Sequence, residues 1–312
     1  MSYLVLLPHI RIENANAVSG FTWGFPAMTH FLGYVHALSR KINAHYGVRL
    51  DGCAVISHEH HVQAYSSGRD YQFSLTRNPL TKEGNTASFN EEGRMHLTVS
   101  LLIECQGEIE NGEYGKAELC DALRTLCPGQ KLAGGSIVGM RDPQIFSSPE
   151  NENQLRKILW RLMPGFVLYD RSEWLMEHYR ERQLHQPDCA LLDVWLDFSS
   201  IVYRAEQPEE GDEARWVYQP KPRPGYLVPL MCGYQRISPL YSAGEVENAR
   251  DGTTPFAFAE AVYGIGEWRG LHRVADIEPI LWRYHTTDTG YYCTAMPVAD
   301  DLIFNDNDDD FE

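Results

Sequence analysis

The stretch LVLLPHIRIENANAVSGFTWGFPAMTHFLGYVHALSRKI, residues 4–42, decides the fold because it contains a strand, a loop and a helix in turn. Its first part ends on polar residues on one side, His9, Arg11 and Glu13. The other side is apolar at every second position, which predicts a strand face that is buried along its whole length. The residues of that apolar side are Leu4, Leu6, Ile10 and Ile12.

The loop NANAVSGFTWGFP, residues 14–26, joins this strand to the helix and is rich in asparagine, glycine and aromatic residues. Such a loop at a strand-to-helix junction can recognise an extended ligand, although an ordinary long loop has the same composition. Pro26 can occupy the first helical position, where its missing N–H costs nothing. The apolar stripe of the following helix consists of Phe31, Val35, Leu38 and Ile42.

The remainder of the first half continues the alternation of strands and helices. Strands are predicted over residues 52–63 and 95–104, a helix over 117–126 and a glycine-bearing strand over 131–140. The polar residues 66–94 form an inserted hairpin or loop. The order β-α-β, insert, β-α-β predicts an α+β protein with a ferredoxin-like (RRM-like) core over residues 1–145. The aromatic signature of RNA-recognition domains is missing from these strands.

The second half, residues 146–299, reads as a mixed helical and strand region. The pattern predicts helices over residues 155–162, 173–183 and 189–203, and a strand over 226–231. Thr254-Pro255 resembles a helix start that Gly264 would end. Five tryptophans, more than a loosely organised half can bury alone, suggest an exposed apolar surface for a protein partner: Trp160, Trp174, Trp195, Trp268 and Trp282.

The net charge of −16 argues against a generally basic nucleic-acid surface. Much of the acid lies in two segments, however: residues 300–312, expected to be a disordered tail, and residues 206–213, expected to be a solvated loop. A local basic groove therefore remains open. The seven scattered cysteines without a CxxC pair, and the lack of a signal peptide or an apolar span, predict a reduced, cytoplasmic protein without a membrane contact.

Catalytic and metal-binding patterns are weak. His58, His60 and His61 would not converge from a strand, so no metal site and no cofactor are expected. His30 and His36 could act as a general base, but the sequence assigns neither of them a partner. The chain contains no P-loop, GxSxG or HExxH motif. We therefore expect no enzymatic activity.

Two other patterns could bind phosphate. Gly134 and Gly135 precede Ser136, and adjacent glycines let backbone N–H groups approach a phosphate, although a bulge or turn explains them equally well. Arg77-Asn78 and Arg94 bracket the insert, where they could also be ordinary surface residues.

Several strings together resemble one family: NANA at 14–17, TWGFP at 22–26, LTRNPL at 75–80, EEGR at 91–94, LAGGSI at 132–137, RLMPGF at 161–166, PGYLVP at 224–229, SPLYSAGEVENARD at 238–251, GEW at 266–268 and HRV at 272–274. In this order they are similar to the Csy-two family, the Cas-five-type subunits of the type I-F CRISPR surveillance (Csy, or Cascade) complex. The resemblance runs from about residue 3 to about residue 284. The acidic tail and the loop over 206–223 lie outside it.

This resemblance implies a non-catalytic "RAMP" protein of antiviral defence with a ferredoxin-like domain and a thumb-like insert. Its partners would be the large Csy subunit, the backbone Csy subunit and the 5′ handle of the CRISPR RNA, with target DNA reached only through the assembled complex. The residues expected to bind RNA are Asn14, Asn16, Trp23, Phe25, Arg77, Asn78, Arg94, Gly134, Gly135, Ser136 and Arg250. Two alternatives remain: an RNA endonuclease of the same fold that uses His30 or His36, and an interaction module that binds no RNA.

Overall fold

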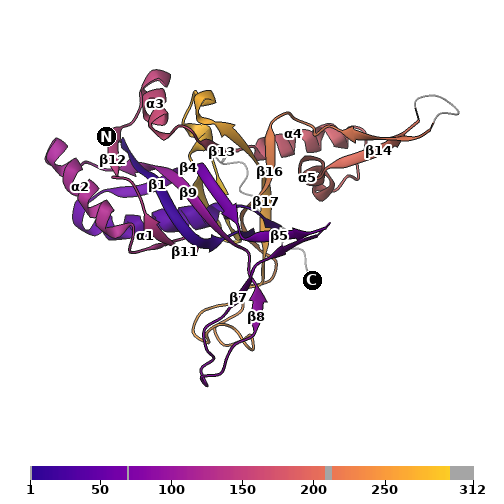
Figure 1. Ribbon diagram of the computed structural model, residues 1–312, viewed down its shortest axis with the longest axis horizontal. Coiled ribbons are helices and arrows are strands. Elements are labelled where there is room, and N and C mark those ends of the chain that lie inside the picture. The colour runs from indigo at the N-terminus through magenta and orange to yellow at the C-terminus, as the bar shows by residue number, and fades with distance from the viewer. Residues whose placement is uncertain (1, 69, 208–212, 296–312) are drawn as a thin grey trace, which may run out of the picture.

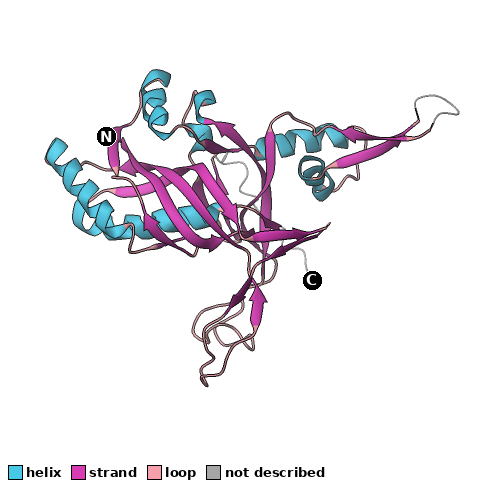
Figure 2. Cartoon of the chain, viewed as in Figure 1, coloured by secondary structure: helices cyan, strands magenta, loops and turns pink. Residues whose placement is uncertain are grey.

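The computed structural model describes residues 2–68, 70–207 and 213–295. It is an α+β protein built on one large antiparallel sheet (Figures 1 and 2). The strand order is β10-β11-β1-β9-β4-β13-β17-β16-β19-β18, and β12 also pairs with β1. Strand β13 of the second half pairs with β4 of the first, so one sheet runs through both of the regions that the sequence analysis divided at residue 145. Strand β12 itself contains residue 145.

The strands of the first half are β1 (Ser2–Asn16), β2 (Val18–Ser19), β3 (Thr22–Trp23), β4 (Arg49–Val62), β5 (Ala64–Ser67), β6 (Asp70–Phe73), β7 (Leu75–Arg77), β8 (Phe89–Glu91), β9 (Arg94–Gln106), β10 (Lys131–Leu132), β11 (Gly135–Gly139) and β12 (Gln144–Ser147). The strands of the second half are β13 (Phe166–Asp170), β14 (Val202–Glu206), β15 (Arg215–Gln219), β16 (Tyr226–Arg236), β17 (Ala259–Gly270), β18 (Arg283–Thr286) and β19 (Gly290–Thr294). The α-helices are α1 (Met28–Tyr46), α2 (Gly112–Leu126), α3 (Glu152–Leu159), α4 (Ser172–Gln183) and α5 (Leu191–Ser199), and the 3₁₀ turns are η1 (Trp160–Leu162), η2 (Leu271–Arg273) and η3 (Glu278–Ile280).

Helices α1 and α2 cover one face of the sheet, which we call the inner face. Their apolar stripes pack on alternate residues of β1, β4 and β9 in the main core. Both predicted helices are present, but α2 begins at Gly112 rather than at residue 117. Helix α1 begins at Met28, with Ala27 as its N-cap, and Pro26 lies outside it. Helix α1 ends at Gly47, which adopts the left-handed conformation at φ 67°. Glycine suits this position because the conformation is strained for residues with a Cβ.

Strand β1 contains a bulge that the sequence did not predict. Leu7 pairs with Leu101 and Ile10 with Val99, so β1 has one extra residue, and His9 adopts φ 50°. The extra residue exchanges the two sides of the strand. The prediction that Leu4 and Leu6 share a side with Ile10 and Ile12 is therefore wrong, since the first pair faces a separate core on the outer face.

The outer face of the sheet is apolar at one end and polar at the other. Helix α3 and the three 3₁₀ turns cover the apolar end, where they enclose Leu4, Leu6, Ile56 and Leu102. Beyond this cover, β1 presents His9 and Arg11, so the predicted polar carboxyl end of the strand is confirmed.

Two predictions for the second half are wrong. Residues 254–264 do not begin a helix: β17 pairs along its length with β16, and this long-range pairing overrides the local helix signal. The helix predicted over 189–203 ends at Ser199 as α5, because residues from Val202 onward pair with β15. The predicted helices over 155–162 and 173–183 and the strand over 226–231 are confirmed.

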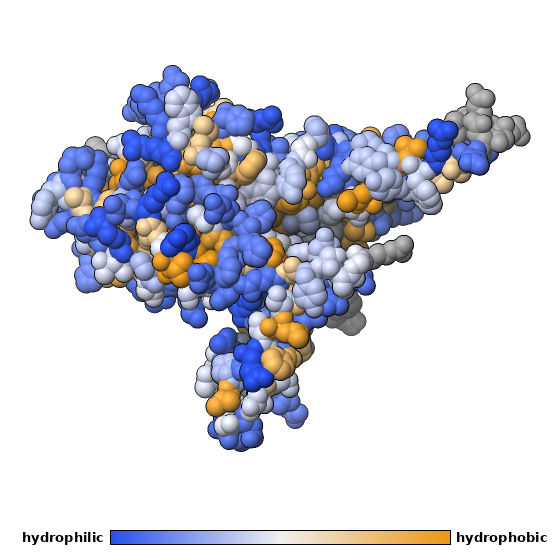
Figure 3. Space-filling model, viewed as in Figure 1, coloured by the Kyte–Doolittle hydropathy of each residue, from blue (hydrophilic) through white to orange (hydrophobic). Residues whose placement is uncertain are grey.

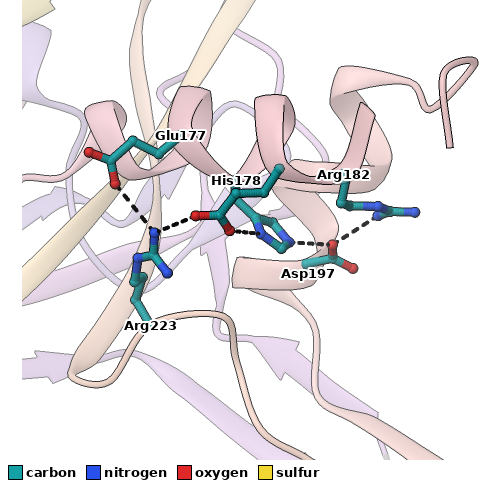
Figure 4. Close-up of polar contacts among 6 residues, drawn as sticks. Glu177, His178, Arg182, Asp197 and Arg223 are labelled. Atoms are coloured by element: carbon teal, nitrogen blue, oxygen red, sulfur yellow. Dashed lines mark hydrogen bonds and ion pairs between the residues drawn. The ribbon is translucent and has the colours of Figure 1, made fainter. Parts of the chain in front are cut away.

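Strands β14 and β15 form an arm that extends away from the sheet (Figure 1). Polar contacts hold its base, where Arg223 bonds to Glu181 at 3.0 Å and Asp197 bonds to His178 at 3.0 Å and to Arg182 at 2.8 Å (Figure 4). These contacts join α4 to α5 and to the chain that leads from β15 to β16. Most of the acidic segment 206–213 and all of the acidic tail 300–312 lie outside the described residues.

No helix in the described part of the chain is long and apolar enough to cross a membrane.

Candidate functional site

The insert predicted over residues 66–94 consists of two hairpins, β5–β6 and β7–β8. It begins at Ala64, slightly earlier than expected, and returns to the sheet at Arg94. Figure 1 shows β7 and β8 pointing away from the sheet. In this view the projection also contains the loop between β16 and β17, and Figure 3 shows hydrophobic residues scattered among hydrophilic ones along it. Since little of its surface is buried, the insert is suited to contact another molecule.

Aromatic rings gather where the first hairpin of the insert meets the loop over residues 14–26. Trp23, on β3, lies 5.6 Å from the ring of Tyr71 and 5.5 Å from that of Phe73. Trp23 is 47% exposed and Tyr71 67% exposed. Gly93 lets the end of the insert pack closely against the loop over residues 14–26, because a Cβ at this position would come 2.3 Å from the Val18 side chain. Exposed, clustered rings of this kind can stack on unpaired bases.

Polar contacts connect the base of the insert to β1. Asn14, at φ 55°, donates its N–H to Nδ1 of His96 at 3.2 Å and accepts a bond from Nε2 of Gln63 at 3.0 Å. Arg94 donates from Nε and a terminal nitrogen to Glu92 at 2.9 and 2.6 Å, and its other nitrogen approaches the Asn14 carbonyl at 3.4 Å. Arg94 therefore already has an anionic partner.

Arg77 lies further along the insert, on β7. Its guanidinium lies 4.4 Å from the centroid of the Phe89 ring, and the side chain is exposed without an ion pair among the described residues. Asn78 follows it and is half-buried. Of the two predicted arginines of the insert, Arg77 is the one whose charge is available to a ligand.

The glycine pair occupies the turn between β10 and β11. Gly134 adopts φ 74°, which favours glycine, and the space beside it is open. A Cβ at Gly135 would come 2.6 Å from the Ile12 side chain and 2.7 Å from the Glu13 carbonyl, so that glycine is required by close packing on β1. Ser136 is exposed. The turn alternative that the sequence left open explains both glycines without a ligand.

The other predicted binding residues are dispersed. Asn16 bonds through its side chain to the backbone of Val18, at 2.8 and 3.1 Å. Phe25 is half-buried between the rings of Phe31 and Trp268. Arg250 is exposed in the long loop between β16 and β17. Asn16 and Phe25 thus support the loop from within, and Trp23 is the member that it presents at the surface.

The candidate general bases lie in different surroundings. His30 is 3.4 Å from Asn16, and burial lowers its pKa. His36 lies 3.1 Å from the hydroxyl of Tyr284, a partner that sequence reasoning did not assign. His36 and Tyr284 border a cavity of about 460 Å³. Within the ranges that the structure describes, no group of three His, Cys, Asp or Glu residues could hold a metal ion.

Sequence reasoning missed four residues of this region: Tyr65, Tyr71, Gln63 and His96. Tyr65 is 51% exposed on the same hairpin as Tyr71. Aromatic residues within an otherwise polar insert were an available signal for both tyrosines. The contacts of Gln63 and His96 with Asn14 depend on pairing between distant strands, which the sequence does not reveal.

Comparison with known proteins gives a consistent result. The family model described as CRISPR-associated protein (Cas_Csy2) matches residues 5–294. A protein of Pseudomonas aeruginosa (strain UCBPP-PA14), CRISPR-associated protein Csy2, is 37% identical over 316 residues, and the alignment covers 94% of this chain and 95% of that protein.

Proposed function

The chain belongs to the Csy2 family of CRISPR-associated proteins, and from this premise we propose that it is a non-catalytic subunit of a type I-F Csy complex that holds the 5′ handle of the CRISPR RNA together with the large Csy subunit. The chain has a CRISPR-related role and other Csy subunits as partners. The backbone Csy subunit would contact the same RNA, target DNA would be reached through the assembled complex, and the site of action would be the cytoplasm.

The insert is the observation that carries this proposal. It projects from the sheet, exposes the ring of Tyr71 beside that of Trp23 from the loop over residues 14–26, and adds the charge of Arg77, which has no ion pair among the described residues. Stacking rings beside a guanidinium are the combination that binds single-stranded nucleic acid. The net charge of −16 does not conflict with this, because a single strand requires only a local basic path.

The order of the core supports a ferredoxin-like, RAMP-type domain. Strands β11, β1, β9 and β4 are adjacent and antiparallel, and both α1 and α2 pack on the inner face. This arrangement corresponds to a βαββαβ chain with the fourth strand beside the first. The insert occupies the connection between the second and third core strands, where it would act as a thumb.

The exposed surface of the arm supports the proposal of a protein partner. Of the five tryptophans from which the sequence suggested an exposed surface, Trp160 is 61% exposed, Trp174 and Trp268 are half-buried, and Trp195 and Trp282 are buried. Instead, one face of the arm exposes alternate residues, Tyr203, Trp216 and Tyr218, and the exposed Ile201 directly precedes β14. A two-stranded ribbon is marginally stable alone. Its apolar face is therefore suited to pack against another subunit, for which we propose the large Csy subunit.

The test is co-purification followed by a binding measurement. The tagged chain, expressed with the large Csy subunit and a CRISPR array, should retain that subunit and RNA that begins with the handle. Binding of labelled handle RNA to the purified pair should exceed binding of a scrambled strand of equal length. Retention of the partner without RNA would favour the interaction module, and retention of neither would refute the proposal.

The non-catalytic role is tested separately. His36 lies within hydrogen-bond distance of the Tyr284 hydroxyl, as a general base and its partner would, so we include a His36→Ala variant. Labelled repeat RNA should stay intact with the wild-type protein, with and without divalent metal. Cleavage that disappears in the His36→Ala or a His30→Ala variant would establish the endonuclease alternative.

A further inference from the structure

Two bulges face each other across β9 on the outer face of the sheet. One is the extra residue of β1 around His9. The other is in β4, where Ser57 pairs with Val99 but Glu59 pairs with Thr98, which leaves His58 between them. Bulges redirect side chains and often lie beside functional sites. Here they bring two histidines from different strands over Ser100 of β9.

The two imidazoles stack in parallel, with ring centroids 4.1 Å apart and an angle of 11° between the planes. His58 lies 2.8 Å from the Pro164 carbonyl through Nδ1 and 2.7 Å from the Ser100 hydroxyl through Nε2. A carbonyl can only accept, so Nδ1 carries the proton and Nε2 accepts from Ser100. The serine oxygen in turn accepts a hydrogen bond from the backbone N–H of His9 at 2.8 Å. Both ring nitrogens of His58 are thus satisfied.

His9 is not satisfied. Its Nδ1 is buried and has no hydrogen-bond partner within the described part of the chain. A buried polar atom without a partner requires an explanation, and a bound ligand or a bound water molecule would provide one.

The stack borders a cavity of about 490 Å³ whose rim carries two arginines, Arg11 and Arg141. The guanidinium of Arg11 lies along the backbone of Gly139, where a Cβ would come 3.2 Å from its terminal nitrogen. Both arginines are exposed, and neither side chain forms an ion pair or hydrogen bond with the residues that the structure describes. Glu59 is the one acidic residue that lines the cavity, and it is exposed. The cavity is therefore cationic and large enough for a nucleotide.

We propose that this cavity, lined by His9, His58, Arg11 and Arg141, binds a phosphate group and is separate from the aromatic and arginine surface of the insert. Arginine suits this ligand because its planar fork donates two parallel hydrogen bonds to phosphate oxygens. The phosphate comes from an RNA strand or from a free phosphate compound. The RNA source rests on the proposed function. It is favoured because Thr98 of β9 lines the cavity, and His96, two residues before it on the same strand, contacts Asn14 at the base of the insert.

The experiment uses the full chain with ¹³C-labelled histidines, whose ring signals are assigned with His9→Gln and His58→Gln variants. Inorganic phosphate and an eight-nucleotide RNA are titrated separately, and an acidic peptide of equal charge serves as a third probe. The test variant is Arg11→Gln/Arg141→Gln. The control is Arg180→Gln, which removes an exposed arginine from α4.

We expect phosphate or RNA to shift the His9 and His58 signals in the wild-type and control proteins. The double variant should lose the shift and bind the effective probe roughly tenfold or more weakly, since hydrogen bonds to charged groups are involved. Response to RNA alone identifies a strand phosphate as the ligand, and response to inorganic phosphate identifies a free phosphate compound. Shifts that persist in the double variant, shifts with the peptide alone, or no shifts at all would overturn the proposal. RNA binding that depends on Arg77 but not on this cavity would refute this inference and leave the proposed function standing.

Discussion

Arg171 and Glu267 form an ion pair across the second half of the sheet, with Nε and Oε2 2.8 Å apart and side chains that are 14% and 11% exposed. The guanidinium also lies 4.5 Å from the ring centroid of Trp174 and 4.8 Å from that of Tyr169. The pair thus joins β17 to the start of α4, next to the arm.

Removal of one member of this pair should destabilise the protein strongly. Arg171→Ala leaves the largely buried Glu267 carboxylate with the longer contact to Arg269, at 3.7 Å, in place of a direct ion pair, and removing one member of a buried pair costs about 3–5 kcal/mol. The measurement is the free energy of unfolding from urea titration. Arg156→Ala, which breaks an exposed pair with Glu152 on α3, is the matched control and should cost below about 1 kcal/mol. Equal losses for the two variants would contradict the structural role of the buried pair.

The stacked histidines should make stability depend on pH. Burial, followed by the charges of His58 and Arg141, lowers the pKa of His9 from 6.5 to about 4, and burial also lowers the pKa of His58. Arg11 and Glu59 also face this site. The unfolded chain takes up these protons first, so the contribution of the stack is complete above pH 6.5 and is lost as the pH falls towards 4.

The corresponding measurement is the midpoint of thermal unfolding between pH 7.5 and 4.5. His9→Gln should flatten its decrease with falling pH, whereas His61→Gln, at an exposed position of β4, should not. Parallel curves for wild type and His9→Gln would show that His9 keeps an ordinary pKa in the folded protein.

The arm should contribute to assembly and little to folding. Trp216 is 74% exposed and Tyr218 47% exposed, so a Trp216→Ser/Tyr218→Ser variant should change the free energy of unfolding of the isolated chain by less than about 1 kcal/mol. Aromatic residues at the centre of an interface commonly contribute 2 kcal/mol or more, so affinity for the large Csy subunit should fall roughly 30-fold or more.

Tyr114→Ser provides the control for the arm. Tyr114 is 68% exposed on α2, which Figure 1 shows at the opposite end of the molecule from the arm. Affinity in a pull-down titration should be unaffected by this change. If both variants bind the large subunit as the wild type does, the arm serves another partner or none.

How far the sequence predicts this structure depends on whether an element is specified locally. Leu97, Val99, Leu101 and Ile103 alternate without interruption, and β9 follows as predicted. The bulge at His9 has no comparable signal, because period-two patterns on both sides of it remain intact. Strand β17 was predicted as a helix because its state depends on pairing with β16, about 30 residues earlier in the chain.

The same distinction applies to the site. The bounds of the insert follow from its polar composition, and Trp23 and Arg77 were predicted at the positions where the structure exposes them. The partner of Arg94 was not predicted, although Glu92 lies two residues away, because the sequence does not show that both side chains turn towards each other. The cavity near His9 depends on four strands, β1, β4, β9 and β11, and on two bulges, so only the folded chain could reveal it.

The two arginines of the insert should differ in their effect on RNA binding. Arg77 is exposed and lies over Phe89 without an ion pair among the described residues, so its charge is available to a phosphate. Arg77→Ala should weaken binding of handle RNA for any sequence alike. It should also reduce the slope of log K against log salt by about 0.7, the value for one phosphate on a single strand.

Arg94 is already neutralised by Glu92, so Arg94→Ala should leave that slope nearly unchanged. Its loss would instead loosen the base of the insert, where it reaches the Asn14 carbonyl. The measurement is a salt titration of the two-subunit complex with handle RNA, and Glu92→Gln, which frees Arg94, serves as the converse variant and should steepen the slope. Equal slopes for all four proteins would mean that RNA does not pass along the insert.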